Sequence, residues 1–191
     1  MSEVYLSRFK VLSGTDRIVF DCEDEDLNDF FCKDAVTHQT HFLSKTYYCT
    51  DDNGEIVVMF SVCNDSIKLP EDRKKIFPKN KWFKSYSAVK LARLGVSSKF
   101  KRKGIGTQAI DFLKCLFVVG NKAGCRFLTV DAYNKEETLS FYKRNGFAHL
   151  TEKDKSKETR TMFLDLFPFY QGVTPEMLEA IKESMRELVG R

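Results

Sequence analysis

Residues 101–107 have the composition of a loop that binds a phosphate group. They are Lys101, Arg102, Lys103, Gly104, Ile105, Gly106 and Thr107. The apolar run 89–96 before them predicts a buried strand, and apolar residues at helical spacing predict a helix that begins at Gly106. Glycines let a turn bend sharply and bring its N–H groups close to a ligand, and a helix N-terminus adds unpaired donors and partial positive charge. The segment therefore predicts an anion site.

Two common phosphate-binding motifs are excluded at this loop. A Walker A loop needs a lysine and then a serine or threonine directly after its second glycine. A dinucleotide fingerprint needs a third glycine and an acidic residue further along the chain. Neither pattern is present. A plain strand-to-helix turn is the alternative that the glycines alone leave open.

Two segments together resemble the signature motifs of the GNAT superfamily of acyl-CoA N-acyltransferases. The first motif, Arg/Gln-x-x-Gly-x-Gly/Ala after a strand, is matched by residues 101–106, which follow Leu94-Gly95-Val96 and have lysine in the first position. The second motif is an asparagine and, several residues later, the pattern apolar-Tyr-x-x-x-Gly-Phe. It is matched by Asn134 and residues 141–147, although Asn134 lies one residue further from Tyr142 than is usual in the family.

The resemblance implies an α/β (α+β) GNAT fold, with helices around a mixed central sheet of about 6–7 strands that splay apart in a V. Gly95 would mark a bulge in the central strand. Acetyl-CoA would be the cosubstrate, and its pantetheine arm would lie in the V. The implied cofactor-binding residues are Leu94, Gly95, Val96, the seven loop residues 101–107 and Asn134.

The resemblance also assigns catalytic roles for transfer of an acetyl group from a thioester to an amine. Tyr142 would protonate the departing thiolate, with packing as its alternative role. Backbone N–H groups near residues 94–96 would stabilise the oxyanion. The resemblance identifies no general base; Asp131, at the end of the predicted strand beside the cleft, is the candidate, with a structural role as the alternative. A site without a strong base would favour an α-amino group, whose pKa is about 7.7–8.0, over a lysine at about 10.4.

Four further segments resemble sequences of the GNAT branch that includes toxins of toxin–antitoxin pairs. Those toxins acetylate the amino group of aminoacyl-tRNA. The four segments are Phe20-Asp21-Cys22, Thr46-Tyr47-Tyr48, residues 91–96 and Phe141-Tyr142. The basic segments 68–90 and 99–103 would suit tRNA phosphates, although segment 68–90 is equally explained as a loop that its aromatic residues pin to the core. Three hypotheses remain: an N-acetyltransferase of a small-molecule or protein amine, the same reaction on aminoacyl-tRNA, and a CoA-binding module without catalysis.

The composition is that of a soluble globular protein. The chain has 191 residues, of which 42% are hydrophobic and 30% charged, and a net charge of +4. No apolar run approaches the ~20 residues that span a bilayer, and no signal-peptide pattern is present, so we expect a cytoplasmic protein without membrane contact. The six cysteines and three histidines lack ligand spacing, and we therefore expect no metal site.

Pattern and turn signals place the surrounding elements. Residues 45–50 and 55–63 predict strands joined by a hairpin turn, residues 23–26 an acidic helix start, and residues 161–167 the last strand. We expect residues 1–170 to form the GNAT domain and residues 171–191 to add an amphipathic helix. The apolar stripe of this helix would pack on the chain itself or, alternatively, on a partner or in a homodimer.

Overall fold

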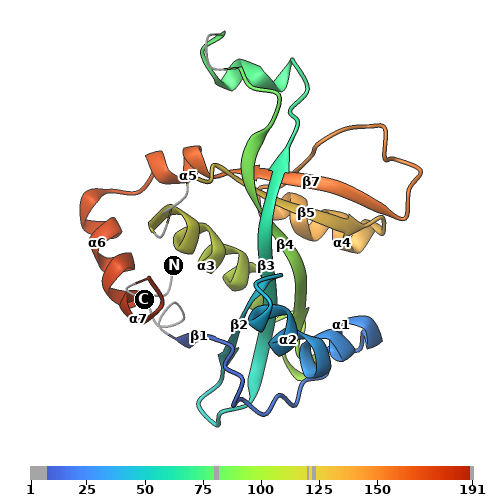
Figure 1. Ribbon diagram of the computed structural model, residues 1–191, viewed down its shortest axis with the longest axis vertical. Helices are drawn as coiled ribbons and strands as arrows, with labels where there is room; N and C mark the ends of the chain where they lie inside the picture. The colour runs from blue at the N-terminus through green and yellow to red at the C-terminus, as the bar shows by residue number, and fades with distance from the viewer. Residues whose placement is uncertain (1–7, 80–81, 120, 122–123, 190–191) are drawn as a thin grey trace.

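The fold is organised around one seven-stranded mixed sheet, as the computed structural model in Figure 1 shows for residues 8–79, 82–119, 121 and 124–189. The strands are β1 Phe9–Val11, β2 Lys45–Thr50, β3 Ile56–Ile67, β4 Tyr86–Val96, β5 Phe127–Tyr133, β6 Ala148–His149 and β7 Thr159–Asp165. Their order is β1-β2-β3-β4-β5-β7-β6, and only β4 and β5 run parallel. The mixed sheet that was predicted is therefore confirmed.

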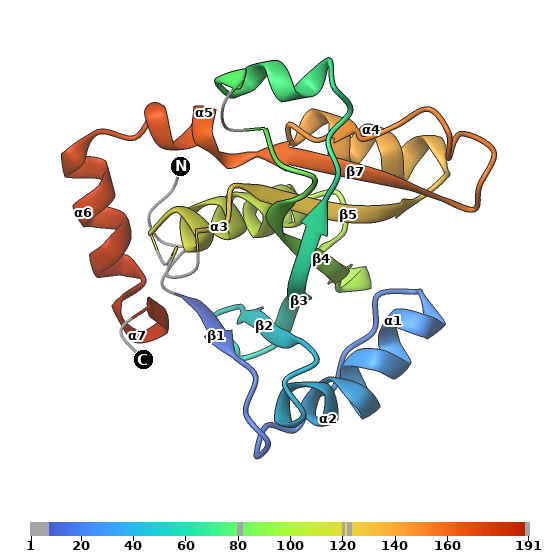
Figure 2. The same ribbon diagram turned by 45° about the horizontal axis from the view of Figure 1, so that its top comes forward.

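Helices cover both faces of the sheet (Figures 1 and 2). They are α1 Glu25–Asp29, α2 Ala35–Thr40, α3 Ile105–Val119, α4 Glu136–Arg144, α5 Leu166–Gln171, α6 Pro175–Ser184 and α7 Arg186–Val189. Helices α3 and α4 share the main core with Val58 and Phe60 of β3. The α1–α2 region packs against Met59. Because alternate residues of a strand face opposite sides, the two helix groups lie on opposite faces.

The central strands β4 and β5 part in the middle of the sheet. Their parallel pairing ends at Lys90 and Thr129, although both strands continue beyond this point. The register of β4 against β3 also shifts here, which leaves Ala92 as the bulged residue. The strands splay as the family resemblance implied. The bulge was predicted at Gly95, and this prediction is wrong, because the bulge lies at Ala92. Gly95 has a packing role, because a Cβ there would lie 3.0 Å from Phe20 Cε1.

The N-terminal elements follow local sequence signals. The hairpin turn between β2 and β3 is confirmed, with Gly54 at φ 81°. The carboxylate of Asp24 accepts the Leu27 N–H at 3.1 Å and caps α1, as expected for an acidic helix start. One difference is a π-helical turn, Phe30–Asp34, between α1 and α2, in which the adjacent residues Phe30 and Phe31 are both buried.

The C-terminal part differs from the prediction in one element. Strand β7 ends at Asp165, whose side chain accepts the Phe167 N–H and starts α5, a short helix that the sequence pattern did not predict. The next helix, α6, contacts α3, and Ile181 and Met185 lie buried in the main core. Packing of the apolar stripe on the chain itself is thus confirmed for these two residues. No helix in the described ranges is long and apolar enough to cross a membrane.

Candidate active site

The predicted anion loop, residues 101–107, follows β4 and includes the first three residues of α3. Gly104 has φ 79°, and a Cβ built on it would meet no atom within 4 Å, so the space in front of this residue is open. The amides in the first turn of a helix have no acceptors inside the helix. Here the first amide with an acceptor in the turn before it is that of Gln108, which donates to Gly104 O at 3.1 Å. The amides of residues 105–107 are therefore available to a phosphate group.

Close packing fixes the position of this loop. Ile105 is buried, whereas Thr107 and residues 101–104 are exposed. A Cβ on Gly106 would lie 3.1 Å from Cε2 of Phe141 in α4 and 3.6 Å from Cγ2 of Val96. The missing side chain thus lets α4 approach the first turn of α3 and the end of β4. This contact brings the second family motif next to the first.

The cations around the loop are mostly engaged with neighbouring groups. Lys101 pairs with Glu23 at 2.8 Å, and Lys99 pairs with Glu55 at 3.0 Å. Lys103 lies over the Phe100 ring, with its Nζ 5.1 Å from the ring centroid. Arg102, at φ 61°, has no ion pair in the described part of the chain. Only part of the positive charge predicted for segment 99–103 is therefore free for a polyanion.

Two backbone amides of β4 point into the splay. Ser97 donates its N–H to Val57 O of β3 at 3.0 Å. Because successive amides of a strand alternate in direction, those of Leu94 and Val96 point away from β3. Strand β5 no longer pairs with β4 at this level, so neither amide has a strand partner there. They are backbone donors of the kind that can stabilise an oxyanion, and this role stays a prediction.

Tyr142 is buried in α4, on the face of the sheet that α3 also covers. Its ring packs against Phe141 at 5.1 Å and Phe147 at 5.4 Å between centroids. Burial raises the pKa of Tyr142 well above its ordinary value, so the phenol stays protonated at neutral pH. Its hydroxyl has no hydrogen-bond partner among the residues that the structure describes. The phenol is therefore in the protonated form that a general acid needs, and its role as the acid stays a prediction.

Asp131 lies in β5 on the opposite face, beside the point where the strands part. It forms an ion pair with Lys90 and accepts a hydrogen bond from Thr161 Oγ1 at 2.8 Å. Burial raises the pKa of Asp131, but the hydrogen bonds from Lys90 and Thr161 and the lysine charge outweigh it, so the pKa lies below its ordinary value. A carboxylate with a lowered pKa is a weak base. The assignment of Asp131 as general base stays a prediction.

Asp131 belongs to a row of polar residues across one sheet face, which we call the polar strip. Its members are Asp65, Lys90, Thr129, Asp131 and Thr161. Thr129 donates to Asp65 at 2.6 Å. The residues between them in β5, such as Leu128 and Val130, face the main core instead. A buried phenol, that of Tyr142, thus lies on one face of the sheet, and a polar, partly exposed surface lies on the other.

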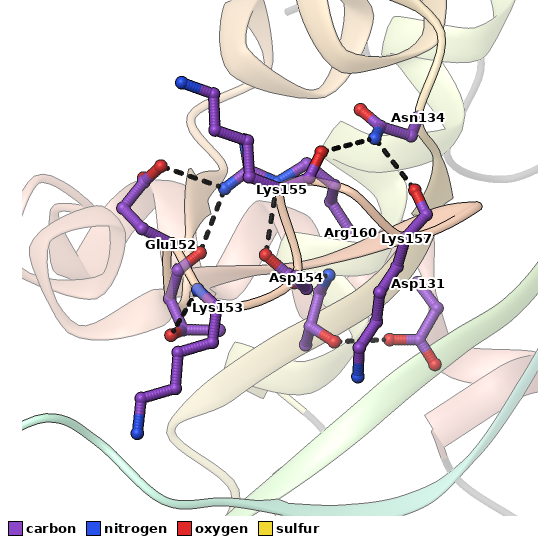
Figure 3. A network of polar contacts seen from close by, with 10 residues as sticks. Asp131, Asn134, Glu152, Lys153, Asp154, Lys155, Lys157 and Arg160 are labelled. Carbon is purple, nitrogen blue, oxygen red and sulfur yellow. Dashed lines mark hydrogen bonds and ion pairs between the residues drawn. The ribbon is translucent and has the colours of Figure 1, made fainter.

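Asn134 has a different set of contacts from those implied by the family motif. Its side-chain amide donates to the carbonyls of Lys155 and Lys157 at 2.9 and 2.8 Å (Figure 3). Both amide hydrogens are thus used to hold the loop between β6 and β7. The cofactor-binding role of Asn134 stays a prediction, and holding this loop is a contact that the structure adds.

Sequence reasoning missed the polar strip as a unit. The available signal was polar residues at alternate positions of apolar strands, as in Phe127-Leu128-Thr129-Val130-Asp131. The partners in β3, β4 and β7 are distant in sequence and meet only through the sheet register.

The basic segment 68–90 is held to the core by an aromatic contact. Phe77 stacks on the buried Tyr86 with ring centroids 4.7 Å apart, so this aromatic residue pins the segment as predicted.

This chain belongs to the GNAT acetyltransferase family. A family model described as "Acetyltransferase (GNAT) domain" matches residues 44–149, which is more than half of the chain. The protein is thus an acyltransferase. A search of curated proteins found no match.

Several solved structures share this fold. One is AtaT complexed with acetyl-methionyl-tRNAfMet, at 19% identity and a TM-score of 0.71, covering 85% of this chain and 96% of that one. A tyrosine-to-phenylalanine mutant of KacT is 18% identical, with a TM-score of 0.70 and coverage of 85% and 96%. AtaTR bound with AcCoA is 20% identical, with a TM-score of 0.65 and coverage of 85% and 95%. At these identities the likeness establishes the fold.

Proposed function

We propose that this acetyltransferase moves the acetyl group of acetyl-CoA to the α-amino group of an aminoacyl-tRNA. The observation that carries the proposal is the state of Asp131. Its ion pair with Lys90 and its lowered pKa make Asp131, the candidate base of the acceptor face, a weak base. An α-amino group with a pKa of about 7.7–8.0 is partly neutral near pH 7.5, whereas a lysine side chain is almost fully protonated. The site therefore favours the α-amino group.

On this proposal the parts of the reaction would lie around the splay. A CoA pyrophosphate fits the free amides of residues 105–107 and the open space at Gly104. An extended arm of about 16 Å that runs back along β4 spans about five residues at about 3.3 Å each. It would end near Ala92, beside Lys90 and Asp131. The bound cosubstrate supplies an activated acetyl thioester at that place.

The residues then divide the work of acyl transfer. The amine would enter over the polar strip, where Asp131 accepts a hydrogen bond and orients it. As the new C–N bond forms, the amide of Leu94, the nearer of the two free β4 amides to that place, would stabilise the oxyanion. When the C–S bond breaks, Tyr142 would give its proton to the thiolate. The amine nitrogen would lose one proton to water over the partly exposed polar strip, and a proton from water would restore the phenol. Burial raises the pKa of the leaving thiol as well as that of the phenol, which keeps this proton transfer feasible.

Two features support tRNA as the carrier of the amine. A structure of similar fold, AtaT, contains acetyl-methionyl-tRNAfMet. The segment between β3 and β4 adds the exposed cations Lys68, Lys75, Lys79 and Lys84, which suit a phosphate backbone. In Figures 1 and 2 this connection projects beyond the sheet. On this proposal the protein acts in the cytoplasm, where charged tRNA is found, and a toxin-like role follows from the loss of free aminoacyl-tRNA.

The test is release of CoA from acetyl-CoA with three acceptors. They are charged tRNA, the methyl ester of the same amino acid, and a lysine peptide with a blocked N-terminus. We expect turnover with charged tRNA, slower turnover with the ester and none with the peptide. Turnover with the peptide alone would refute the proposal and favour a protein-amine acceptor. Binding of acetyl-CoA without turnover on any acceptor would indicate a non-catalytic module.

A further inference from the structure

We infer that the loop between β6 and β7, residues 151–158, is a preformed contact for RNA phosphates beside the acceptor face. The inference rests on the proposed function and names a surface through which the tRNA would be held. Three lysines of the loop carry the contact, and a set of buried polar residues fixes its shape.

A buried ion pair closes the base of the loop. Arg160 Nε lies 3.2 Å from Asp154 Oδ1, and only 7% and 8% of the two side chains are exposed. Arg160 also donates to Thr151 O at 3.0 Å, and Asp154 accepts the Thr161 N–H at 2.8 Å. Each charged group thus has further hydrogen bonds, which a buried pair requires. The loop is therefore held in one conformation.

Asn134 fixes the outer part of the same loop from β5. Its side chain binds the carbonyls of Lys155 and Lys157, and its backbone N–H donates to Glu158 O at 2.8 Å. All these bonds are made to main-chain atoms of the loop. The lysine side chains stay free of them, and no dashed line reaches their ammonium groups in Figure 3.

The lysines of the loop are exposed and unpaired. Lys153, Lys155 and Lys157 have no acidic partner within the described chain. Of the three acidic residues of the loop, Asp154 and Glu152 are bound by Arg160, which leaves Glu158. Lys99 and Lys101, by comparison, are already paired with carboxylates.

Position and rigidity favour RNA as the partner. The loop leads directly into Thr161, which contacts Asp131 in the polar strip. The three lysines therefore lie near the place where the acceptor amine would enter. The phosphates nearest the aminoacylated end of a tRNA would lie within reach of these lysines. Because the main chain is already fixed, binding orders only the side chains and costs less conformational entropy.

The test compares two triple variants that remove equal charge. The first replaces Lys153, Lys155 and Lys157 by glutamine. The control also introduces glutamine, at Lys10, Lys45 and Lys182. Lys10 and Lys45 lie in β1 and β2, at the opposite edge of the sheet from the loop, and Lys182 lies in α6. Fluorescence anisotropy would measure binding of labelled uncharged tRNA over a range of salt concentrations. Acetylation kinetics with charged tRNA and with the amino-acid methyl ester would follow.

We expect only the loop variant to bind tRNA about tenfold more weakly, with the slope of log K against log salt reduced by about 0.7–0.9 for each lost phosphate contact. Its KM for charged tRNA would rise, while its kinetics with the ester would not change. Equal tRNA binding by both triple variants, or no tRNA binding by the parent protein, would overturn the inference. Binding through the loop without acetylation of charged tRNA would instead refute the proposed function alone.

Asn134→Ala tests the positioning role without changing charge. We expect it to raise the KM for charged tRNA in the parent protein and to add little in the loop variant, because the lysines it positions are already gone. Equal effects in both backgrounds would show that Asn134 does not act through these lysines.

Discussion

Replacement of Tyr142 by phenylalanine tests the central assignment of the site. The change removes one hydroxyl group and keeps the ring contacts with Phe141 and Phe147. Because the hydroxyl has no partner in the described chain, its loss leaves no buried polar group unsatisfied. The free energy of unfolding should therefore change by less than about 0.5 kcal/mol. Binding of acetyl-CoA should also be unchanged.

The effect on catalysis should be large. General acid catalysis contributes about 10²–10⁴-fold, which corresponds to about 2.7–5.4 kcal/mol at 1.36 kcal/mol for each factor of ten. Single-turnover acetylation of charged tRNA would measure the chemical step, and calorimetry would measure acetyl-CoA affinity. Tyr47→Phe is the matched control, because Tyr47 is also buried, with its pKa raised to about 12, but packs against Phe60 under α3.

Two results would refute this reasoning about Tyr142. A loss of rate below about fivefold would mean that the phenol does not protonate the thiolate, since the expected minimum is about a hundredfold. An equal loss of rate in Tyr47→Phe would show that the effect comes from a general change in the core. In either case the ring would be a packing residue, and the acid would have to be sought elsewhere around the splay.

Three further perturbations test other parts of the site. Asp131 has a lowered pKa, so its carboxylate stays charged until the pH falls through that low value. The decrease of kcat/KM below about pH 8 should therefore come from protonation of the α-amino group and should persist in Asp131→Asn. If this decrease disappears in Asp131→Asn, Asp131 is a base after all. Gly104 and Gly54 have φ of 79° and 81° and open space around them, so Gly104→Ala and Gly54→Ala should each lower the free energy of unfolding by about 1–2 kcal/mol. Only Gly104→Ala should weaken acetyl-CoA binding in calorimetry, by roughly tenfold. Equal acetyl-CoA affinities of the two variants would argue against the anion loop. Gly95→Ala should lower the free energy of urea unfolding by about 1–3 kcal/mol, because its Cβ meets Phe20 at 3.0 Å, and an unchanged midpoint would contradict this packing.

Local signals predicted the anion loop and its flanking elements. The chemistry of that loop depends on residues that are adjacent in sequence, so its glycines, its cations and the helix start could all be identified directly. The hairpin turn at Gly54 and the cap at Asp24 are local in the same sense. The short helix α5 was missed because Asp165 ends a strand and caps a helix at once, and a strand pattern hides the cap.

The contacts of Asp131 and Asn134 could not be predicted, because they depend on strand register. Lys90 and Thr161 reach Asp131 from neighbouring strands on either side of β5. Asn134 lies within the family motif, yet the loop 151–158 uses both hydrogens of its side-chain amide. A motif specifies which residue types occur at a position, whereas the fold decides which partners they meet.

On the proposed mechanism, the splay of the sheet would let one site keep its acid and its acceptor surface apart. In a continuous sheet Tyr142 and Asp131 would be separated by paired backbone, because they lie on opposite faces. Once β4 and β5 part after Lys90, a thioester between the strands could be reached from both faces. The phenol then stays dry and protonated in the core, while the amine is met by charged groups that contact water. Each group would thus keep the protonation state that its proposed role in acetyl transfer requires.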